Sequence, residues 1–192
     1  MPPAAGAWCE GWWAGARHSP SPNHGPRPAG VPVDLVVLHS ISLPPGRYGG
    51  PEVEDFFLNR LDTQRDPALA GLAGVQVSAH FFIRRDGECV QFVSTHRRAW
   101  HAGVSAFQGR SDCNNFSIGI ELEGLEGLSF EPAQYRSLVS LLRALRQGHP
   151  LRAITGHQHI APGRKGDPGD GFDWPALQRR LRWSPRWFPD AS

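Results

Sequence analysis

The chain has few of the features that mark a secreted or membrane-bound protein. Its three cysteines, Cys9, Cys89 and Cys113, form no CxxC pair and follow no disulfide-framework spacing, which favours a reducing compartment. The first ten residues lack the basic start and continuous apolar run of a signal peptide, and no apolar run is long enough to span a membrane. We therefore expect a soluble, cytoplasmic protein without a membrane partner.

An excess of one charge is also missing. Lys and Arg number 20 against 18 Asp and Glu, and the basic residues are scattered along the chain rather than gathered in one segment. Proteins that bind nucleic acid usually carry a basic stripe or patch, so no nucleic-acid partner is expected. A hydrophobic fraction of 40% without internal repeats or a long linker suits one core, and we expect a monomer.

Proline placement predicts how the chain is divided. Four prolines between Ser19 and Pro28 exclude a helix or a central strand there, because proline fixes φ and lacks the backbone N–H donor. Residues 1–32 are therefore expected to be an extended segment packed on the surface of a single domain, residues 33–192. Regular structure is expected to begin near Val33.

Hydrophobic periodicity predicts a central mixed β-sheet flanked by helices, in the α/β or α+β class. The Asp86-Gly87 turn between two β-rich runs is a strong hairpin signal. In a later run Ile118, Ile120 and Leu122 share one face, and Glu121 lies on the other. The expected strands are 33–38, 77–84, 88–93, 117–123 and 152–154, and the expected helices are 52–61, 132–147 and 174–183.

One loop, Thr155 to Gly169, concentrates the groups that a hydrolytic zinc site needs. Imidazole and carboxylate are zinc ligands, and a lysine nearby can stabilise a developing oxyanion. Asp167 and one of two histidines, His157 or His159, are the candidate ligands, because alternate residues of an extended segment point in opposite directions. The third candidate is His39, at the end of the strand expected at 33–38.

Each of these residues also has an ordinary structural interpretation. His39 could be a core histidine at a strand end, and Asp167 could be a turn carboxylate in an Asp-Pro-Gly turn. Lys165 could be a solvated loop charge, and Glu121 a carboxylate on an exposed sheet face. Their joint occurrence at strand ends and in one loop is what favours a site.

The chain contains six longer motifs. They are Val37-Leu38-His39-Ser40-Ile41-Ser42-Leu43-Pro44-Pro45-Gly46, Val77-Ser78-Ala79-His80, Ile83-Arg84-Arg85-Asp86-Gly87, Arg98-Ala99-Trp100-His101-Ala102-Gly103, Cys113-Asn114-Asn115-Phe116-Ser117 through Gly124, and Thr155-Gly156-His157 through Arg164-Lys165-Gly166-Asp167-Pro168-Gly169. With these motifs the chain closely resembles the zinc N-acetylmuramoyl-L-alanine amidases, from about Glu10 to Trp174.

The resemblance implies that residues 33–192 form one zinc amidase catalytic domain. It implies one Zn²⁺ per chain held by His39, His157 and Asp167, and catalytic roles for Glu121 and Lys165. The implied reaction is hydrolysis of the amide between N-acetylmuramic acid and L-alanine, with a soluble anhydromuramyl peptide of peptidoglycan recycling as substrate. Glu121 would move the proton while the metal and Lys165 stabilise the oxyanion. Trp100 and His101 are candidates for the sugar-facing wall.

The chain departs from the family pattern in places that concern the base and the peptide. Distant relatives often carry tyrosine where this chain has Ala79 and lack the acid at Glu121, so Glu121 is expected to serve as base here. The resemblance implies that recycling amidases grip the acidic end of the peptide with arginines near the positions of Gln76 and Asp112. This chain lacks both arginines, and Arg110 is the nearby candidate. A secreted or phage-type lytic amidase and a non-catalytic peptidoglycan-recognition module are the alternatives.

Overall fold

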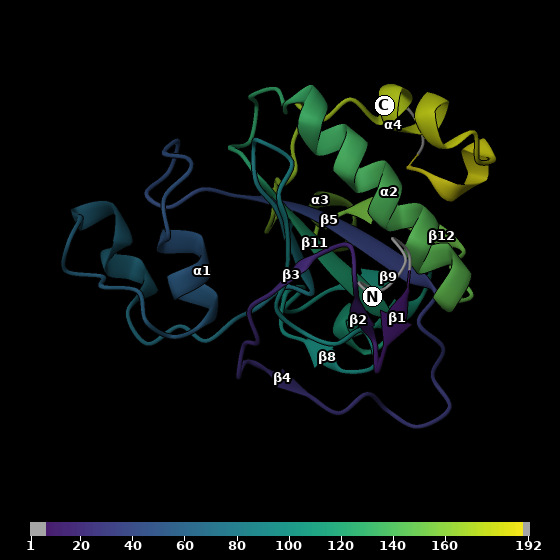
Figure 1. The fold of residues 1–192 in the computed structure, drawn as a ribbon, viewed down its shortest axis with the longest axis horizontal. Helices are drawn as coiled ribbons and strands as arrows, with labels where there is room; N and C mark the ends of the chain where they lie inside the picture. Colours follow the sequence, from purple (N-terminus) through teal and green to yellow (C-terminus); the bar gives the residue numbers. More distant parts are fainter. Residues whose placement is uncertain (1–6, 190–192) are drawn as a thin grey trace.

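The computed structural model describes residues 7–189 and is built around one six-stranded sheet. Figure 1 shows this sheet crossed by a long helix on one side, with a shorter helical region extending to the left. The strand order is β12 (Ala153–Gly156), β5 (Leu35–Ile41), β11 (Ser117–Glu123), β6 (Phe81–Ile83), β7 (Cys89–Gln91) and β3 (Arg17–His18).

The sheet is mixed, as the sequence predicts. Strands β12, β5, β11 and β6 run parallel, β6 and β7 form the antiparallel hairpin expected around Asp86-Gly87, and β3 adds parallel to β7. In the register of the two central strands, Glu121 of β11 lies directly beside His39 of β5. Paired residues of neighbouring strands project to the same face, so these two side chains share one face of the sheet.

Helix α2 (Pro132–Gly148) covers the opposite face of the sheet (Figure 1). Its leucines join Val36 and Leu38 of β5 and Ile118, Ile120 and Leu122 of β11 in the largest core cluster. The predicted face of β11 is therefore confirmed. Helix α4 (Trp174–Leu181) contributes Leu177 and Leu181 to the same cluster.

A second core lies beyond β6 and β7. Val53, Phe56 and Phe57 of helix α1 (Glu52–Phe57) pack there against Phe82, Val90 and Phe92. Helix α1 is four residues shorter than expected, because Leu58 and Asn59 leave the helix and Asn59 has φ +58°. The remaining short elements are β8 (Arg98–Ala99), β9 (Ala106–Phe107), β10 (Arg110–Ser111), α3 (His157–Ile160) and the 3₁₀ turns η1 (Pro67–Leu72), η2 (Cys113–Asn115) and η3 (Pro185–Trp187).

The prediction that regular structure begins near Val33 is wrong. Short strands occur earlier, at β1 (Trp8–Cys9), β2 (Trp12–Trp13), β3 and β4 (His24–Gly25), and Trp13 is buried in the main core. Ser21 and Asn23 in the proline-rich segment are also buried, and both donate to the carbonyl of Phe57. The segment is extended and packed on the rest of the chain, but it is part of the sheet and core. Residues 1–6 lie outside the described residues.

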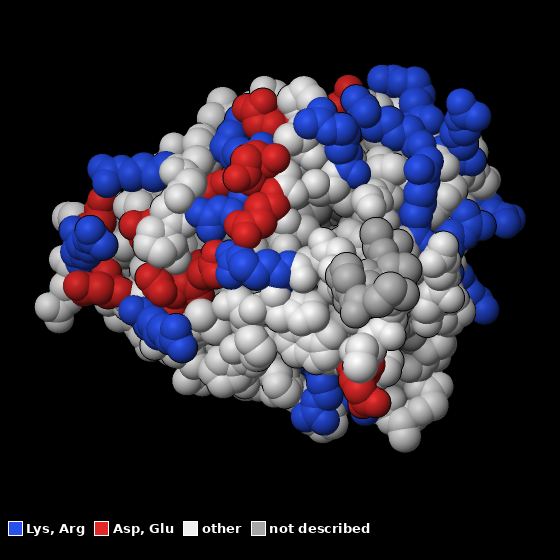
Figure 2. All heavy atoms as spheres, in the orientation of Figure 1, with Lys and Arg blue, Asp and Glu red and all other residues white. Residues whose placement is uncertain are grey.

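Charge is distributed unevenly over the surface. Figure 2 shows basic side chains gathered around α2 and α4, whereas acidic and basic side chains are interspersed toward α1. Helix α1 carries Glu52, Glu54 and Asp55, whereas Arg146 and Arg179 lie in the last turns of α2 and α4. Among residues 7–189, no helix has the length and apolarity that a membrane crossing needs.

Candidate metal centre

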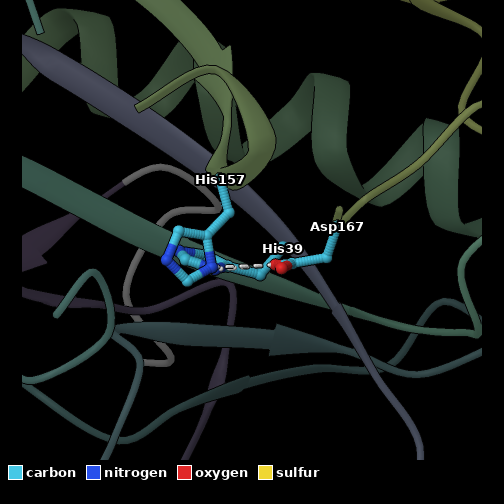
Figure 3. Close-up of side chains that lie close together, drawn as sticks. All are labelled: His39, His157 and Asp167. Atoms are coloured by element: carbon cyan, nitrogen blue, oxygen red, sulfur yellow. Dashed lines mark hydrogen bonds and ion pairs between the residues drawn. The ribbon is translucent and has the colours of Figure 1, made fainter. Parts of the chain in front are cut away.

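Three buried side chains meet at the ends of neighbouring strands (Figure 3). His39 Nδ1 lies 3.0 Å from His157 Nδ1, and each of these nitrogens lies 3.1 Å from Asp167 Oδ2. His39 belongs to β5, His157 follows β12, and Asp167 comes from the loop after α3. The carboxyl ends of parallel strands are where α/β proteins usually place ligands.

The triangle of atoms fits a metal ion better than it fits hydrogen bonds. An imidazole nitrogen presents one proton or one lone pair in a single direction, so it cannot point at both other corners of the triangle. A tetrahedral ion with bonds of 2.0–2.1 Å separates its ligand atoms by about 3.3 Å, close to the spacing here. The three residues can therefore hold a metal ion and leave a fourth position for water or substrate.

Local structure explains why His157 rather than His159 lies at the centre. The chain makes a helical turn at His157–Ile160 instead of continuing extended, which corrects the expected opposite orientation of alternate residues. His159 Nδ1 accepts from the backbone N–H of Gly156 and lies near Thr155 Oγ1. The ring of His159 is thus turned back toward β12.

The loop that carries Asp167 is tied to this helical turn. The N–H of Gln158 donates to the carbonyl of Asp167 at 2.9 Å, and Gln158 Oε1 accepts from the N–H of Gly169 at 2.9 Å. A Cβ atom added at Gly156 would lie 2.9 Å from Pro168 Cδ, so glycine lets the loop approach the strand end. This contact accounts for the glycine before His157.

Burial and hydrogen bonding set the charges of the three residues. Burial lowers the pKa of His39 to about 4, against the opposing effect of Asp167, so its imidazole is neutral near pH 7. Burial would raise the pKa of Asp167, but its contacts with the imidazoles of His157 and His39 outweigh burial and hold that pKa well below its ordinary value. A neutral imidazole and an ionised carboxylate are the forms that bind metal.

Glu121 is half-buried beside this centre, and one of its carboxyl oxygens is enclosed by protein. Its Oε2 atom has no hydrogen-bond partner among the described residues. Burial, and then the charge of Asp167, raise the pKa of Glu121 well above its ordinary value, while Lys165 acts in the opposite direction. A buried carboxyl with a raised pKa in a charged site is suited to proton transfer.

Lys165 is the only lysine among the 20 basic residues of the chain. Its side chain is exposed, and its ammonium makes no hydrogen bond or ion pair with any residue between 7 and 189. The charge of Lys165 lowers the pKa of both Glu121 and His39. The ammonium therefore acts on the same two groups that meet at the centre. The scarcity of lysine in an arginine-rich chain was a signal that motif analysis did not use.

The residues predicted to bind substrate are placed less simply. Arg110 donates to Asp34 Oδ1 at 2.8 Å and lies 3.8 Å above the ring of Phe116. Asp34 lies five residues before His39, so about 16 Å of strand separates it from the metal ligands. The guanidinium of Arg110 is therefore engaged away from the centre, and the structure gives no support to a role in gripping the peptide.

Trp100 and His101, the candidates for the sugar-facing wall, have side chains that point to different parts of the molecule. Trp100 is half-buried, and its indole lies near Gly25 of β4. His101 faces the other way, with its Nδ1 atom 2.9 Å from His39 Nε2. Analysis of the sequence did not predict this contact. It also missed Arg27, which donates to the carbonyls of Thr95, Asn114, Asn115 and Ser117 and for which the proline-rich segment gives no signal.

Comparison with known proteins agrees with this arrangement. The model of the family described as N-acetylmuramoyl-L-alanine amidase matches residues 29–170. The 1,6-anhydro-N-acetylmuramyl-L-alanine amidase AmpD of Citrobacter freundii is 52% identical over 167 residues, which cover 86% of this chain and 89% of the relative.

Solved structures give the same picture at the level of the fold. A crystal structure of an AmpD derivative superposes with a TM-score of 0.86 at 49% identity, covering 92% of this chain and 97% of the other. The N-acetylmuramyl-L-alanine amidase AmiD from E. coli, in complex with anhydro-N-acetylmuramic acid-L-Ala-D-γ-Glu-L-Lys, superposes with a TM-score of 0.58 at 30% identity. That match covers 79% of this chain and 59% of AmiD.

Proposed function

The chain belongs to the N-acetylmuramoyl-L-alanine amidase family, and from that premise we propose that it hydrolyses 1,6-anhydro-N-acetylmuramyl-L-alanine amides in peptidoglycan recycling. The bond cleaved joins the lactyl carbonyl of the sugar to the L-alanine nitrogen. The observation that carries the proposal is the triangle of His39, His157 and Asp167 with Glu121 on the neighbouring strand.

The metal that we assign to this site is Zn²⁺, one per chain, held by His39, His157 and Asp167. Two imidazoles and a carboxylate are a usual ligand set of catalytic zinc. When bound, zinc would lower the pKa of a water molecule and polarise the scissile carbonyl.

The protein's own residues would move the proton and place the charge. Glu121 takes a proton from the attacking water and delivers it to the L-alanine nitrogen as the C–N bond breaks, which yields a free amine and a lactyl carboxylate. Lys165 places its ammonium where the carbonyl oxygen becomes negative, and it interacts more strongly with that oxyanion than with the neutral substrate. Removal of Lys165 should therefore affect the transition state more than substrate binding.

The setting follows from the same proposal. The substrate would be a soluble anhydromuramyl peptide, acted on by a monomer. Its catalytic domain would comprise residues 33–192 together with the N-terminal segment within residues 1–32, which shares their sheet and core. Residues 1–6 and 190–192 of these ranges lie outside the described part. The cysteines Cys9, Cys89 and Cys113 are all unpaired, which suits a reducing cytoplasm.

The test compares two substrates under two metal conditions. The protein is incubated with anhydromuramyl tripeptide or with intact peptidoglycan sacculi, and released peptide is measured by mass spectrometry. We expect rapid release from the soluble substrate, loss of release after chelation, and its return with one equivalent of Zn²⁺. Preferential cleavage of sacculi would favour a lytic amidase, and binding without release would favour a recognition module.

A further inference from the structure

The two histidines of the metal centre both bond to one short loop segment, His101 and Ala102. His39 Nε2 lies 2.9 Å from His101 Nδ1, and His157 Nε2 lies 3.1 Å from the carbonyl oxygen of Ala102. This leaves the Nδ1 atom of each ring facing the centre. The segment therefore contacts the outward-facing nitrogen of both ligands.

The hydrogen bonds that link Ser117, His101 and His39 can be assigned a donor and an acceptor one after another. The Ser117 hydroxyl donates its single proton to the carbonyl of Cys113 at 2.6 Å, so it can only accept from His101 Nε2 at 3.1 Å. His101 then carries its proton on Nε2 and has a lone pair on Nδ1. His39 must donate from Nε2 to that lone pair, which leaves its own lone pair on Nδ1.

The counterpart at His157 is simpler. The Ala102 carbonyl has no proton, so His157 must donate from Nε2 and keeps the lone pair on Nδ1. Both histidines are thereby in the tautomer that a metal at the centre requires. We propose that His101 and Ser117 act as positioning residues that select the metal-binding tautomer and orientation of His39.

The surroundings hold this relay in place. Asn114 Oδ1 accepts from the backbone N–H groups of both His101 and Ala102, at 3.1 and 2.9 Å. Gly119, on β11, lies under the His101 ring, and any Cβ atom there would collide with it. Arg164 donates to the Ala102 carbonyl at 2.8 Å, which fixes the acceptor for His157 from the other side.

The inference rests on the proposed zinc function, and its test is a metal titration that needs no substrate. The full chain is stripped of metal and titrated with Zn²⁺ against a chromophoric chelator, while ring-nitrogen NMR of the metal-free protein reports the tautomer of His39. His101→Phe keeps a ring but cannot accept the hydrogen bond from His39 Nε2. We expect it to weaken zinc binding by about 10- to 100-fold and to give His39 a mixed tautomer.

Two variants and a control separate positioning from packing. His101→Asn places an amide oxygen at the position of Nδ1 and should restore most of the affinity. Ser117→Ala, which keeps the ring in place, should weaken zinc binding by a smaller factor and mix the His101 tautomers. His149→Phe replaces a half-buried histidine that follows α2 and makes no contact with the centre, so its zinc affinity should equal that of the parent.

The outcomes are distinct. Parental zinc affinity and an unchanged His39 tautomer in His101→Phe, together with a lowered melting temperature of the metal-free form, would show a merely structural role and overturn the inference. If His101→Phe does not fold, parental affinity and tautomers in Ser117→Ala would overturn it instead. A parent protein that binds no zinc would remove the proposed function as well as the inference.

Discussion

A buried carboxylate lies near each end of strand β5, and the two carboxylates have different partners. At the start of the strand, Asp34 accepts from the guanidinium of Arg110 at 2.8 Å. At its end, Asp167 lies 3.1 Å from the imidazoles of His39 and His157. Asp34 therefore pairs with one positive charge, whereas Asp167 faces two imidazole nitrogens that carry lone pairs.

That difference separates a structural contact from a binding site. The pair of Asp34 and Arg110 is complete, because charge is neutralised within the protein. At the other end an ionised carboxylate and a neutral imidazole, with burial holding the pKa of His39 at about 4, leave a negative charge and converging lone pairs. A buried set of this kind is costly unless a cation joins it.

The largest effect should come from removing the carboxylate at the metal end. Asp167→Ala should weaken zinc binding by more than about 100-fold and abolish turnover, since a lost ligand costs at least as much as a lost supporting bond. Metal analysis and peptide release measure both. Asp34→Ala is the matched control, and it should retain one equivalent of zinc. Equal zinc content in both variants would erase the distinction between the two ends.

Glu121→Gln should lower kcat by at least about 100-fold, the usual size of a general acid–base contribution. The amide preserves the size of the side chain but cannot take a proton. Zinc content and substrate Kd should stay near parental values, as measured by metal analysis and calorimetry. A variant that turns over at close to the parental rate would make Glu121 a structural residue.

Lys165→Ala should lower kcat and kcat/KM together by about 100-fold, as loss of an oxyanion donor does. Steady-state kinetics with the soluble substrate provides the measurement. Lys165→Arg keeps the positive charge on a longer fork and should recover part of the loss. An unchanged kcat with a raised KM would instead assign Lys165 to binding of the substrate in its ground state.

Near the start of β5, Arg110→Ala should reduce the free energy of unfolding by about 1–3 kcal/mol, the cost of leaving the buried Asp34 carboxylate without its partner. Urea unfolding measures this quantity. The Arg110 side chain is 41% exposed, which limits the loss. The KM for the soluble substrate should not change. A raised KM with unaltered stability would restore the role in gripping the peptide that the sequence predicted for Arg110.

The smallest effect concerns pH and is confined to acid solution. His149 lies three residues before Arg152, whose backbone N–H donates to the carbonyl of Asp34. Burial, followed by the charges of Arg27 and His96, lowers the pKa of His149 to about 4. The unfolded chain has the ordinary value of about 6.5 and so binds more protons between these limits. Stability of the metal-free protein should therefore fall as pH drops from 6.5 toward 4. His149→Phe should reduce that slope, measured by urea unfolding at each pH.

Regular patterns made much of the fold predictable. Strand β11 has the bounds that its alternation indicates, 117–123, and α2 extends the expected helix by one residue. The strands before Val33 could not be found in this way, because two residues carry no periodicity and β3 exists only through its pairing with β7. Local patterns predict elements long enough to repeat, and short ones depend on distant partners.

The candidate site shows the same limit. Residue types alone indicated His39, Asp167 and one of two loop histidines as metal ligands. The choice of His157 over His159 depended on a helical turn that composition did not indicate. The orientation of His101 depends on Gly119, eighteen residues away on another element. Glycine has no side chain, so the space that Gly119 leaves for the His101 ring gives no signal in the sequence around His101.

The single lysine of the chain gives the centre a built-in reporter. Reductive methylation with ¹³C-labelled formaldehyde modifies primary amines and preserves their positive charge, so the only labelled side chain would be Lys165. Its methyl resonance would follow metal loading, pH and product occupancy in the intact protein without any engineered substitution. Acetylation of the same nitrogen removes its positive charge, so the contribution of the ammonium could be abolished chemically in the parent protein.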